Sequence, residues 1–200
     1  AESKQEPIRL KEIAALFRRN KYVWLYAAIM LCYNILTNLA VGAYYFKWII
    51  GNISVQGLLS IVSFFLVPVM VVFPTMMKKI GSMGKMIFVF SIIGAVGYGI
   101  AFVSGSWLPG VLIGYVLGQF ATLPIAYYGI LFIMNICTYN EMLGMPRMDG
   151  SSGILSNFAA KLGGALGAWI TGVLLSLAGY ISAEGVTEQP ASALMMIRID

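Results

Sequence analysis

Lys161 is the residue whose surroundings most strongly indicate chemistry. It lies in the apolar stretch 153–181, about eight residues and so some 12 Å from its start if the stretch is helical. An ionisable side chain at that depth in a membrane is costly and often marks a functional site with a partner nearby. No acid of this chain lies inside an apolar stretch, so the expected partner comes from elsewhere. The alternative is that the long stem of Lys161 carries its ammonium group to the membrane surface.

Polar and small side chains share the predicted helix with Lys161. Asn157 lies one turn before it, beside Ser156, so a polar stripe could face a watery cavity. Small residues four apart would let a second helix approach closely: Gly163, Gly164, Gly167, Ala168 and Gly172. Such residues alone more often serve packing. Together with the polar stripe they predict a helix that lines a central cavity.

Amides and phenols gather in the first apolar stretch, 22–50. Asn34 and Asn38 lie one turn apart there. These groups suit sugar hydroxyls, because amides hydrogen-bond neutral partners and aromatic rings offer faces for stacking. Hydrogen bonding between helices of a bundle is the alternative. Gln119 and Tyr127, in a later apolar stretch, allow the same two interpretations.

The loop before the stretch 153–181 contains charges of both signs. Glu141, Arg147 and Asp149 could form an ion-pair cluster on the cytoplasmic side, which holds helix ends in one conformation and releases them in another. A plain solvated loop is the alternative. The sequence thus offers a candidate cytoplasmic gate.

A bundle of membrane-spanning helices would have to position these residues. The chain is 60% hydrophobic and only 10% charged, whereas about a quarter of the residues in globular proteins are charged. Its apolar stretches do not alternate as strands of a membrane barrel do. Five of them reach the ~20 residues that a helix needs to cross a bilayer: 22–50, 55–75, 86–104, 107–135 and 153–181. The sequence therefore predicts an all-α integral membrane protein with five transmembrane helices, kinked at Pro68 and Pro124.

Basic residues are unevenly distributed over the predicted loops. Six lie in residues 1–21 and three at 78–85, but none lie at 51–56 or 104–107. This alternation fits the positive-inside rule with a cytoplasmic N-terminus. We expect a multi-pass protein of the plasma (inner) membrane.

The two ends differ from the spans between them. Residues 1–21 have apolar positions at helical spacing and basic residues on the other side, which predicts a cytoplasmic amphipathic segment on the membrane surface. A flexible linker is the alternative. Residues 182–200 are predicted to be an extracytoplasmic loop and the start of a sixth span. Because that apolar run stops after nine residues, Ala191 to Ile199, we expect a truncated span and a chain that is part of a longer protein.

Several classes of function are disfavoured. The net charge is +5, but the basic residues form no dense patch interleaved with aromatic residues, so no nucleic acid is expected. There is no histidine, and Cys32 and Cys137 resemble small buried hydrophobes, so neither a metal site nor a cofactor is expected. A membrane-embedded enzyme would need clustered acids near the interface, and only Glu141 and Asp149 are available. No catalytic residue is assigned.

A longer pattern runs through the charged loop and the stretch after it. Its approximate form is D-x-x-D-Y-x-E-x-x-x-G-x-R-x-E-G followed by S-x-x-x-F-x-x-K-x-G. The positions that meet it are Tyr139, Glu141, Gly144, Arg147, Gly150, Phe158 and Lys161, with Asp149 in place of a glutamate. Here the sequence resembles the glycoside–pentoside–hexuronide:cation symporter family (melibiose permease-like) of the major facilitator superfamily. The likeness covers essentially the whole chain, and Asn135 and Thr138 replace the two aspartates of the pattern.

The resemblance implies the C-terminal half of a transporter. The chain would supply five helices of a major-facilitator-type six-helix bundle, with the sixth truncated. Lys161 would help to connect the sugar and cation sites. The carboxylates that bind the coupling ion would lie mainly in an N-terminal half.

Residues and resemblance together give a working hypothesis. We expect part of a secondary active transporter that imports a glycoside, pentoside or hexuronide with Na⁺ or H⁺ by alternating access. Its partners would be the lipid bilayer, the sugar and the N-terminal half. A transporter of lipid or another amphiphile is the alternative, since the spans carry few polar groups; a membrane-embedded enzyme or sensor is less favoured. The substrate-binding residues would be Lys161, Asn157, Ser156, Tyr127, Asn34 and Asn38.

Overall fold

Helices and short connections make up the whole described chain. The computed structural model describes residues 10–39, 41–147, 149–183 and 186–199, and none of these residues lies in a β-strand. The all-α membrane fold is therefore confirmed. In chain order the helices are α1 (Leu10–Arg19), α2 (Lys21–Asn38), α3 (Val41–Trp48), η1 (Ile53–Gln56), α4 (Gly57–Ser63), η2 (Phe64–Leu66), α5 (Val67–Ile80), α6 (Met83–Ser104), α7 (Leu108–Gln119), α8 (Leu123–Met142), α9 (Asp149–Ser152), α10 (Ile154–Leu177) and α11 (Ala191–Ile199).

Four segments of the described chain are long and apolar enough to cross a membrane: Lys21–Trp48, Met83–Ser104, Leu108–Met142 and Ile154–Leu177. The expected stretch 55–75 is also helical, but it is divided among η1, α4, η2 and α5 and so forms no single long α-helix. The number of five spans, and the boundaries assigned to them, stay predictions.

The first expected span is broken near its middle. Three side chains in the last turns of α2 hydrogen-bond to carbonyls of their own helix: Asn34 Nδ2 to Met30, Thr37 Oγ1 to Tyr33 and Asn38 Nδ2 to Asn34. Such bonds compete with the backbone ladder and bend helices. The backbone turns extended at Leu39 (ψ 111°), and α3 begins at Val41. A break inside a membrane segment places free backbone groups where they can line a cavity.

Two prolines mark the other interruptions. Pro124 stands in the first turn of α8, after the turn that ends α7, and Pro68 stands in the first turn of α5, after η2. Proline has no N–H to donate to the preceding turn but fits the start of a helix. Both prolines thus stand at the start of a helix, and the kinks expected there stay predictions.

Glycines set the two closest helix pairs. The most extensive contact in the structure joins α2 and α10, and the next joins α6 and α7. A Cβ placed on Gly163 would lie 2.5 Å from the Leu31 carbonyl oxygen, and one on Gly167 would lie 2.6 Å from that of Ile35. Small residues thus let backbones touch, as expected from the Gly163 series. Gly97 and Gly114 play the same role between α6 and α7.

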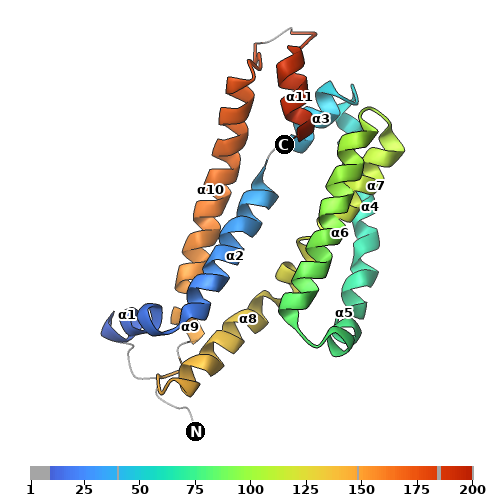
Figure 1. Ribbon diagram of the computed structural model, residues 1–200. Coiled ribbons are helices and arrows are strands. Elements are labelled where there is room, and N and C mark those ends of the chain that lie inside the picture. The colour runs from blue at the N-terminus through green and yellow to red at the C-terminus, as the bar shows by residue number, and fades with distance from the viewer. Residues whose placement is uncertain (1–9, 40, 148, 184–185, 200) are drawn as a thin grey trace.

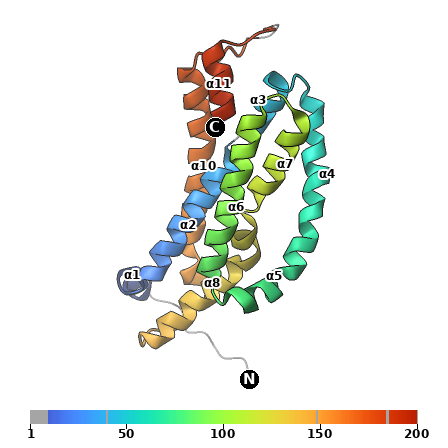
Figure 2. The ribbon, with the colours of Figure 1, turned by 45° about the vertical axis from the view of Figure 1, so that its right-hand side comes forward.

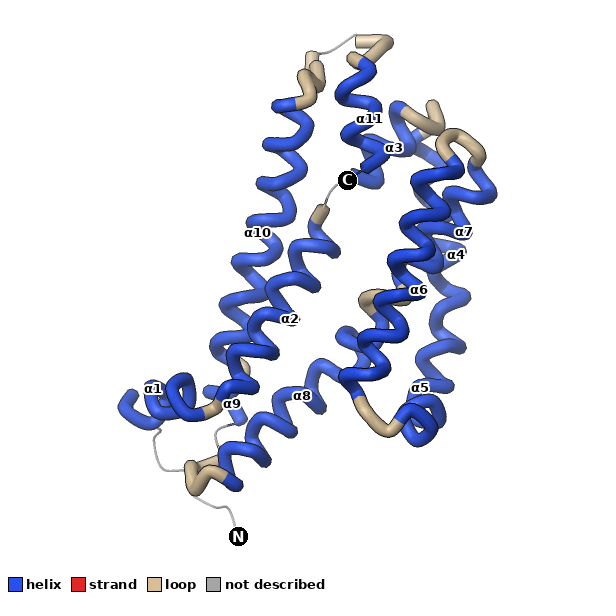
Figure 3. Tube along the Cα trace, in the orientation of Figure 1, coloured by secondary structure: helices blue, strands red, loops and turns tan. Residues whose placement is uncertain are grey.

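The helices form two groups in space (Figure 1). One contains α2 and α10, and the other contains α4, α5, α6 and α7. Figure 3 shows α8 running obliquely between the groups at one end, where α1 and α9 also lie, and α3 and α11 together at the other end. The turned view in Figure 2 shows α4 and α5 following one another alongside α6 and α7.

Buried side chains are correspondingly divided among three clusters. One is centred on Phe46 where α3, α7, α10 and α11 meet, one on Phe73 between α5, α6 and α8, and one on Leu16 between α1, α2 and α8. Outside them many large apolar residues are exposed, among them Phe64, Ile130 and Val103. Such a surface is typical of helices packed in lipid.

Candidate functional site

A cavity lies beside the break in the first span. Its volume is about 500 Å³, within the usual range for small-molecule sites. We call it the polar cavity. Its hydrogen-bonding and aromatic lining comes from α2, η1, α6, α7 and the turn after α7: Thr37, Gln56, Tyr98, Tyr115, Gln119 and Thr122. None of the residues that line it is an acid, a lysine or an arginine.

Gln119 is held in place within the polar cavity. Its Nε2 donates to Ser63 Oγ at 2.6 Å, and the Ser63 hydroxyl donates to the Leu59 carbonyl at 2.6 Å. Thr122 Oγ1 donates to the Gln119 backbone carbonyl at 2.8 Å. This chain of bonds orients the amide and joins α4 to the end of α7. The cavity therefore has a positioned neutral hydrogen-bonding group beside the rings of Tyr98 and Tyr115, which lie 6.5 Å apart.

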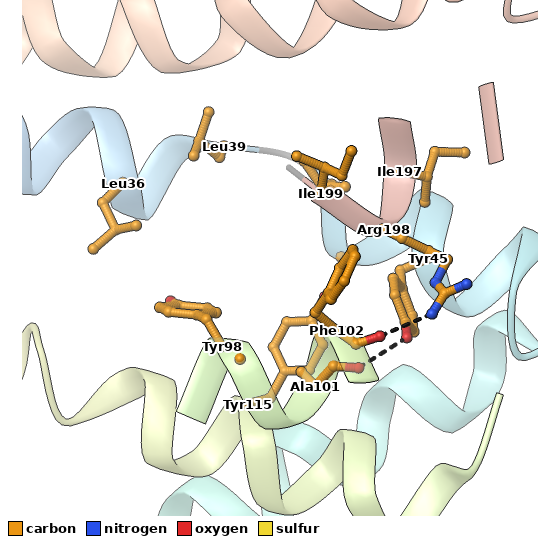
Figure 4. A pocket seen from close by; sticks show the side chains of 13 residues that line it. Leu36, Leu39, Tyr45, Tyr98, Ala101, Phe102, Tyr115, Ile197, Arg198 and Ile199 are labelled. Carbon is orange, nitrogen blue, oxygen red and sulfur yellow. Dashed lines mark hydrogen bonds between the residues drawn. The ribbon is translucent and has the colours of Figure 1, made fainter. Parts of the chain in front are cut away.

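A second cavity, of about 510 Å³, adjoins the polar cavity and shares Tyr98 and Tyr115 with it. Figure 4 shows Tyr45 and Arg198 together at one side of this cavity. Arg198 Nη2 donates to the Phe102 carbonyl at 2.9 Å, and Tyr45 Oη donates to the Gly105 carbonyl at 2.6 Å. Both side chains thus satisfy carbonyls that the end of α6 leaves free, so Arg198 has a structural role in fixing α11 to α6.

Lys161 and Asn157 share one exposed face of α10. A second exposed face carries Phe158, Leu162 and Trp169, at the same helical spacing. The large apolar face suits lipid, and the other suits water or a polar partner. No acid of the described chain lies within ion-pair distance of Lys161. Its partner from outside the chain stays a prediction.

Ser156 lies on a different side of the same helix. It is buried, and its hydroxyl donates to the Gly153 carbonyl at 3.0 Å. The structure thus brings Asn157 and Lys161 together and turns Ser156 toward the bundle interior.

Asn34 and Asn38 lie at the seam between α2 and α10. A Cβ on Gly163 would lie 3.0 Å from that of Asn34, and one on Gly164 would lie 3.6 Å from the Asn38 amide nitrogen. Both amides donate to carbonyls of their own helix. Neither of the two interpretations made for them, sugar binding or bonding between helices, is decided by these contacts.

Tyr127 lies on α8, away from the polar cavity. Its ring meets Phe73 edge-on at 5.1 Å between centroids, and its side chain is 42% exposed. It does not line either cavity described above.

Among the described side chains of the loop expected to form a gate, Arg147 and Glu141 form a weak ion pair. Arg147 Nη1 lies 3.9 Å from Glu141 Oε2, with both side chains more than 40% exposed. Pairs of this kind contribute about 0–1 kcal/mol. Asp149 begins α9, and its side chain lies outside the described part of the structure.

A neutral network beside this loop was not expected from the sequence. Asn20 Nδ2 donates to Asn140 Oδ1 at 2.5 Å, and Asn140 Nδ2 donates to Ser152 Oγ at 3.2 Å. All three side chains are fully buried. Asn20 also caps α2 by accepting from the Tyr22 N–H at 2.9 Å. The network therefore fastens the ends of α2, α8 and α9, and the gate expected from the charged residues stays a prediction.

Four residues of the polar cavity, Gln56, Tyr98, Tyr115 and Thr122, were missed because their separate stretches gave no common signal. Gln56 lies at the start of the predicted stretch 55–75, Tyr98 and Tyr115 are single aromatic residues in apolar runs, and Thr122 is a single hydroxyl in such a run. Only Gln119 stood out in sequence, as an amide in a predicted span. No group of three or more His, Cys, Asp or Glu within the described chain is placed to hold a metal ion.

Long apolar helices, an interrupted span and a polar cavity beside the interruption define a multi-pass membrane protein built like a transporter. The chain belongs to the MFS/sugar transport protein family, whose sequence model matches residues 1–199, and thus to the major facilitator superfamily. The family is one of transporters rather than enzymes. No curated protein and no solved structure matched the chain.

Proposed function

We propose that this protein is part of a secondary active transporter that moves a sugar together with Na⁺ or H⁺ by alternating access. The polar cavity carries the proposal, since neutral amides, hydroxyls and aromatic faces are the groups that bind sugar hydroxyls and rings. Its lining without acids, lysine or arginine favours a neutral glycoside or pentoside over a hexuronide.

The exposed face with Asn157 and Lys161 has a separate role in this proposal. It faces the N-terminal half, where an acid pairs with Lys161 and takes part in binding the coupling ion. An unpaired lysine at such depth would be costly, and alternating access requires two halves that move about a shared site. We place the N-terminus in the cytoplasm and the protein in the plasma membrane, on the distribution of basic residues.

A transporter of a lipid or another amphiphile remains the second candidate. A cavity of about 350 Å³ shares Leu36 and Thr122 with the polar cavity, and its lining is mostly apolar, including Leu25, Ile29 and Ile125. Such a cavity suits an acyl chain better than a sugar.

The test is uptake into proteoliposomes with an inward Na⁺ or H⁺ gradient, using labelled neutral glycosides and, separately, labelled lysolipids. Ser63→Ala frees the Gln119 amide and should lower glycoside uptake about tenfold, as expected for loss of a positioned hydrogen bond. Ser60→Ala is the matched control, because Ser60 is exposed on the same helix. Equal uptake by both variants, or uptake of lysolipid alone, would overturn the assignment of the cavity to sugar.

A further inference from the structure

A groove between α2 and α8 shares no lining residue with the polar cavity proposed to bind sugar. Its volume is about 360 Å³ and its walls are mostly apolar, with Leu25 and Ile29 on one side and Phe132 on the other. Leu25 is 57% exposed, and Met142, at the α8 end of the groove, is 77% exposed. Only Asn135 and Thr138 interrupt the apolar and aromatic lining.

Two cations stand at the end of this groove where α2 begins. Tyr22 and Tyr139 meet edge-on there, with centroids 4.8 Å apart. Lys21 Nζ lies 5.4 Å from the centroid of the Tyr22 ring. Arg19 Nη2 donates to the carbonyl of Leu143, the residue after Met142, at 3.4 Å. The positive charges thus flank one end of an apolar channel.

Further basic residues lie near the same end of the groove. Lys11 and Arg18 are exposed on α1, which leads directly into this end of the groove. Among residues 10–21 there are four basic residues and one acid, Glu12. The acid nearest the groove in sequence is Glu141, whose carboxylate is paired with Arg147 at 3.9 Å.

We infer that this groove binds one anionic phospholipid, with its phosphate between Arg19 and Lys21 and an acyl chain along Leu25, Ile29 and Phe132. The cations complement a phosphodiester, and the apolar walls complement a chain that a soluble anion lacks. Trp24 supports a position of this end of the groove near the membrane surface, where tryptophan is enriched. It is 55% exposed, and its indole N–H donates to the Phe17 carbonyl at 2.7 Å. The site does not depend on which sugar is transported or on which side of the membrane α1 lies.

Binding can be measured on the purified protein in neutral detergent by native mass spectrometry. Dioleoylphosphatidylglycerol should bind at one site, and dioleoylphosphatidylcholine should bind at least fivefold more weakly. Each Lys or Arg near a membrane surface contributes about 1 kcal/mol to binding an anionic lipid, which is about a fivefold change in affinity. Lys21→Gln should therefore weaken binding about fivefold, and Arg19→Gln combined with Lys21→Gln about 25-fold. Lys78→Gln with Lys79→Gln is the matched control, since these exposed lysines at the end of α5 line no cavity described here.

Two further experiments distinguish a phospholipid from a soluble phosphate compound as the ligand of the groove. Glycerol 3-phosphate has a phosphate group with at least as much negative charge but no acyl chain, so it should not displace the lipid. Leu25→Asn leaves both cations in place and should weaken lipid binding by reducing the apolar wall. The inference is overturned if the control pair loses as much affinity as the Arg19 and Lys21 pair, if the two phospholipids bind equally, or if glycerol 3-phosphate competes fully. Because Lys21 is exposed on the helix surface, its single variant tests the site without disturbing the fold.

Discussion

Replacing Gly163 by alanine adds one methyl group at the place where α10 crosses α2. The new Cβ would lie 2.5 Å from the Leu31 carbonyl oxygen, a backbone atom that cannot rotate away. Carbon and oxygen atoms in ordinary contact lie about 3.5 Å apart, so the two helices must separate locally by about 1 Å. Overpacking of this kind costs about 1–3 kcal/mol.

Gly172→Ala is the control on the same helix. Nothing lies within 4 Å of a Cβ at that position. Alanine there should stabilise the helix by up to about 1 kcal/mol, because it is a better helix former than glycine. The same chemical change is thus expected to shift stability in opposite directions at two positions of α10.

Thermal unfolding in detergent can be followed by labelling of Cys137 with a fluorogenic maleimide. Cys137 is fully buried and reacts on unfolding, whereas Cys32 is exposed and can be replaced by serine beforehand. At about 2–4 °C per kcal/mol for a chain of this size, Gly163→Ala should lower Tm by about 2–12 °C. Gly172→Ala should leave Tm unchanged or raise it. Equal shifts for the two variants would refute the close crossing of α2 and α10.

Three further changes test other parts of the structure. Asn140→Ala removes two buried hydrogen bonds, the one that Asn140 accepts from Asn20 and the one that it donates to Ser152, and should cost about 1–3 kcal/mol in the same unfolding assay; an unchanged Tm would show that the network does not hold the helix ends. Tyr45→Phe removes the hydroxyl that bonds to the end of α6 and should cost about 1 kcal/mol, whereas Tyr44→Phe removes a hydroxyl without a described hydrogen bond and should cost less. Lys161→Val should reduce gradient-driven sugar uptake to background without lowering Tm, because the side chain is exposed; normal uptake would remove Lys161 from the mechanism.

The sequence predicted features that depend on a single helix. The membrane character follows from the apolar stretches, and the Gly163 and Gly167 pair identified a face on which another helix packs. The position of Lys161 along its helix could also be counted from the sequence, because the predicted stretch 153–181 begins one residue before α10. Each of these properties is set by composition or by helical periodicity, which are visible in one sequence.

Features that depend on several distant segments were not predicted. Asn20 and Asn140 form a buried pair although 120 positions separate them, and neither carries a charge that would draw attention. The hydrogen-bonding and aromatic lining of the polar cavity comes from four helices and a turn. Before the break at Leu39, side chains bond to their own backbone, a local competition that hydrophobic periodicity does not show.

The charged loop and the buried amides beside it make different kinds of contact. Glu141 and Arg147 stand out because they are charged in an apolar chain, but their contact is long and exposed. In this region the buried amides have the shorter bonds and the tighter packing. We therefore expect substitutions of Asn140 to affect stability more than substitutions of Glu141.

The central claim is that the polar cavity binds a neutral sugar during ion-coupled transport. The most direct measurement is accumulation of labelled neutral glycosides in proteoliposomes, with and without an inward Na⁺ or H⁺ gradient, for the unmodified protein and for Gln119→Leu. The account predicts gradient-dependent accumulation that Gln119→Leu lowers to background, because leucine cannot replace the amide fixed by Ser63. Full accumulation by Gln119→Leu, or no glycoside uptake from a protein that translocates lysolipid, would contradict it.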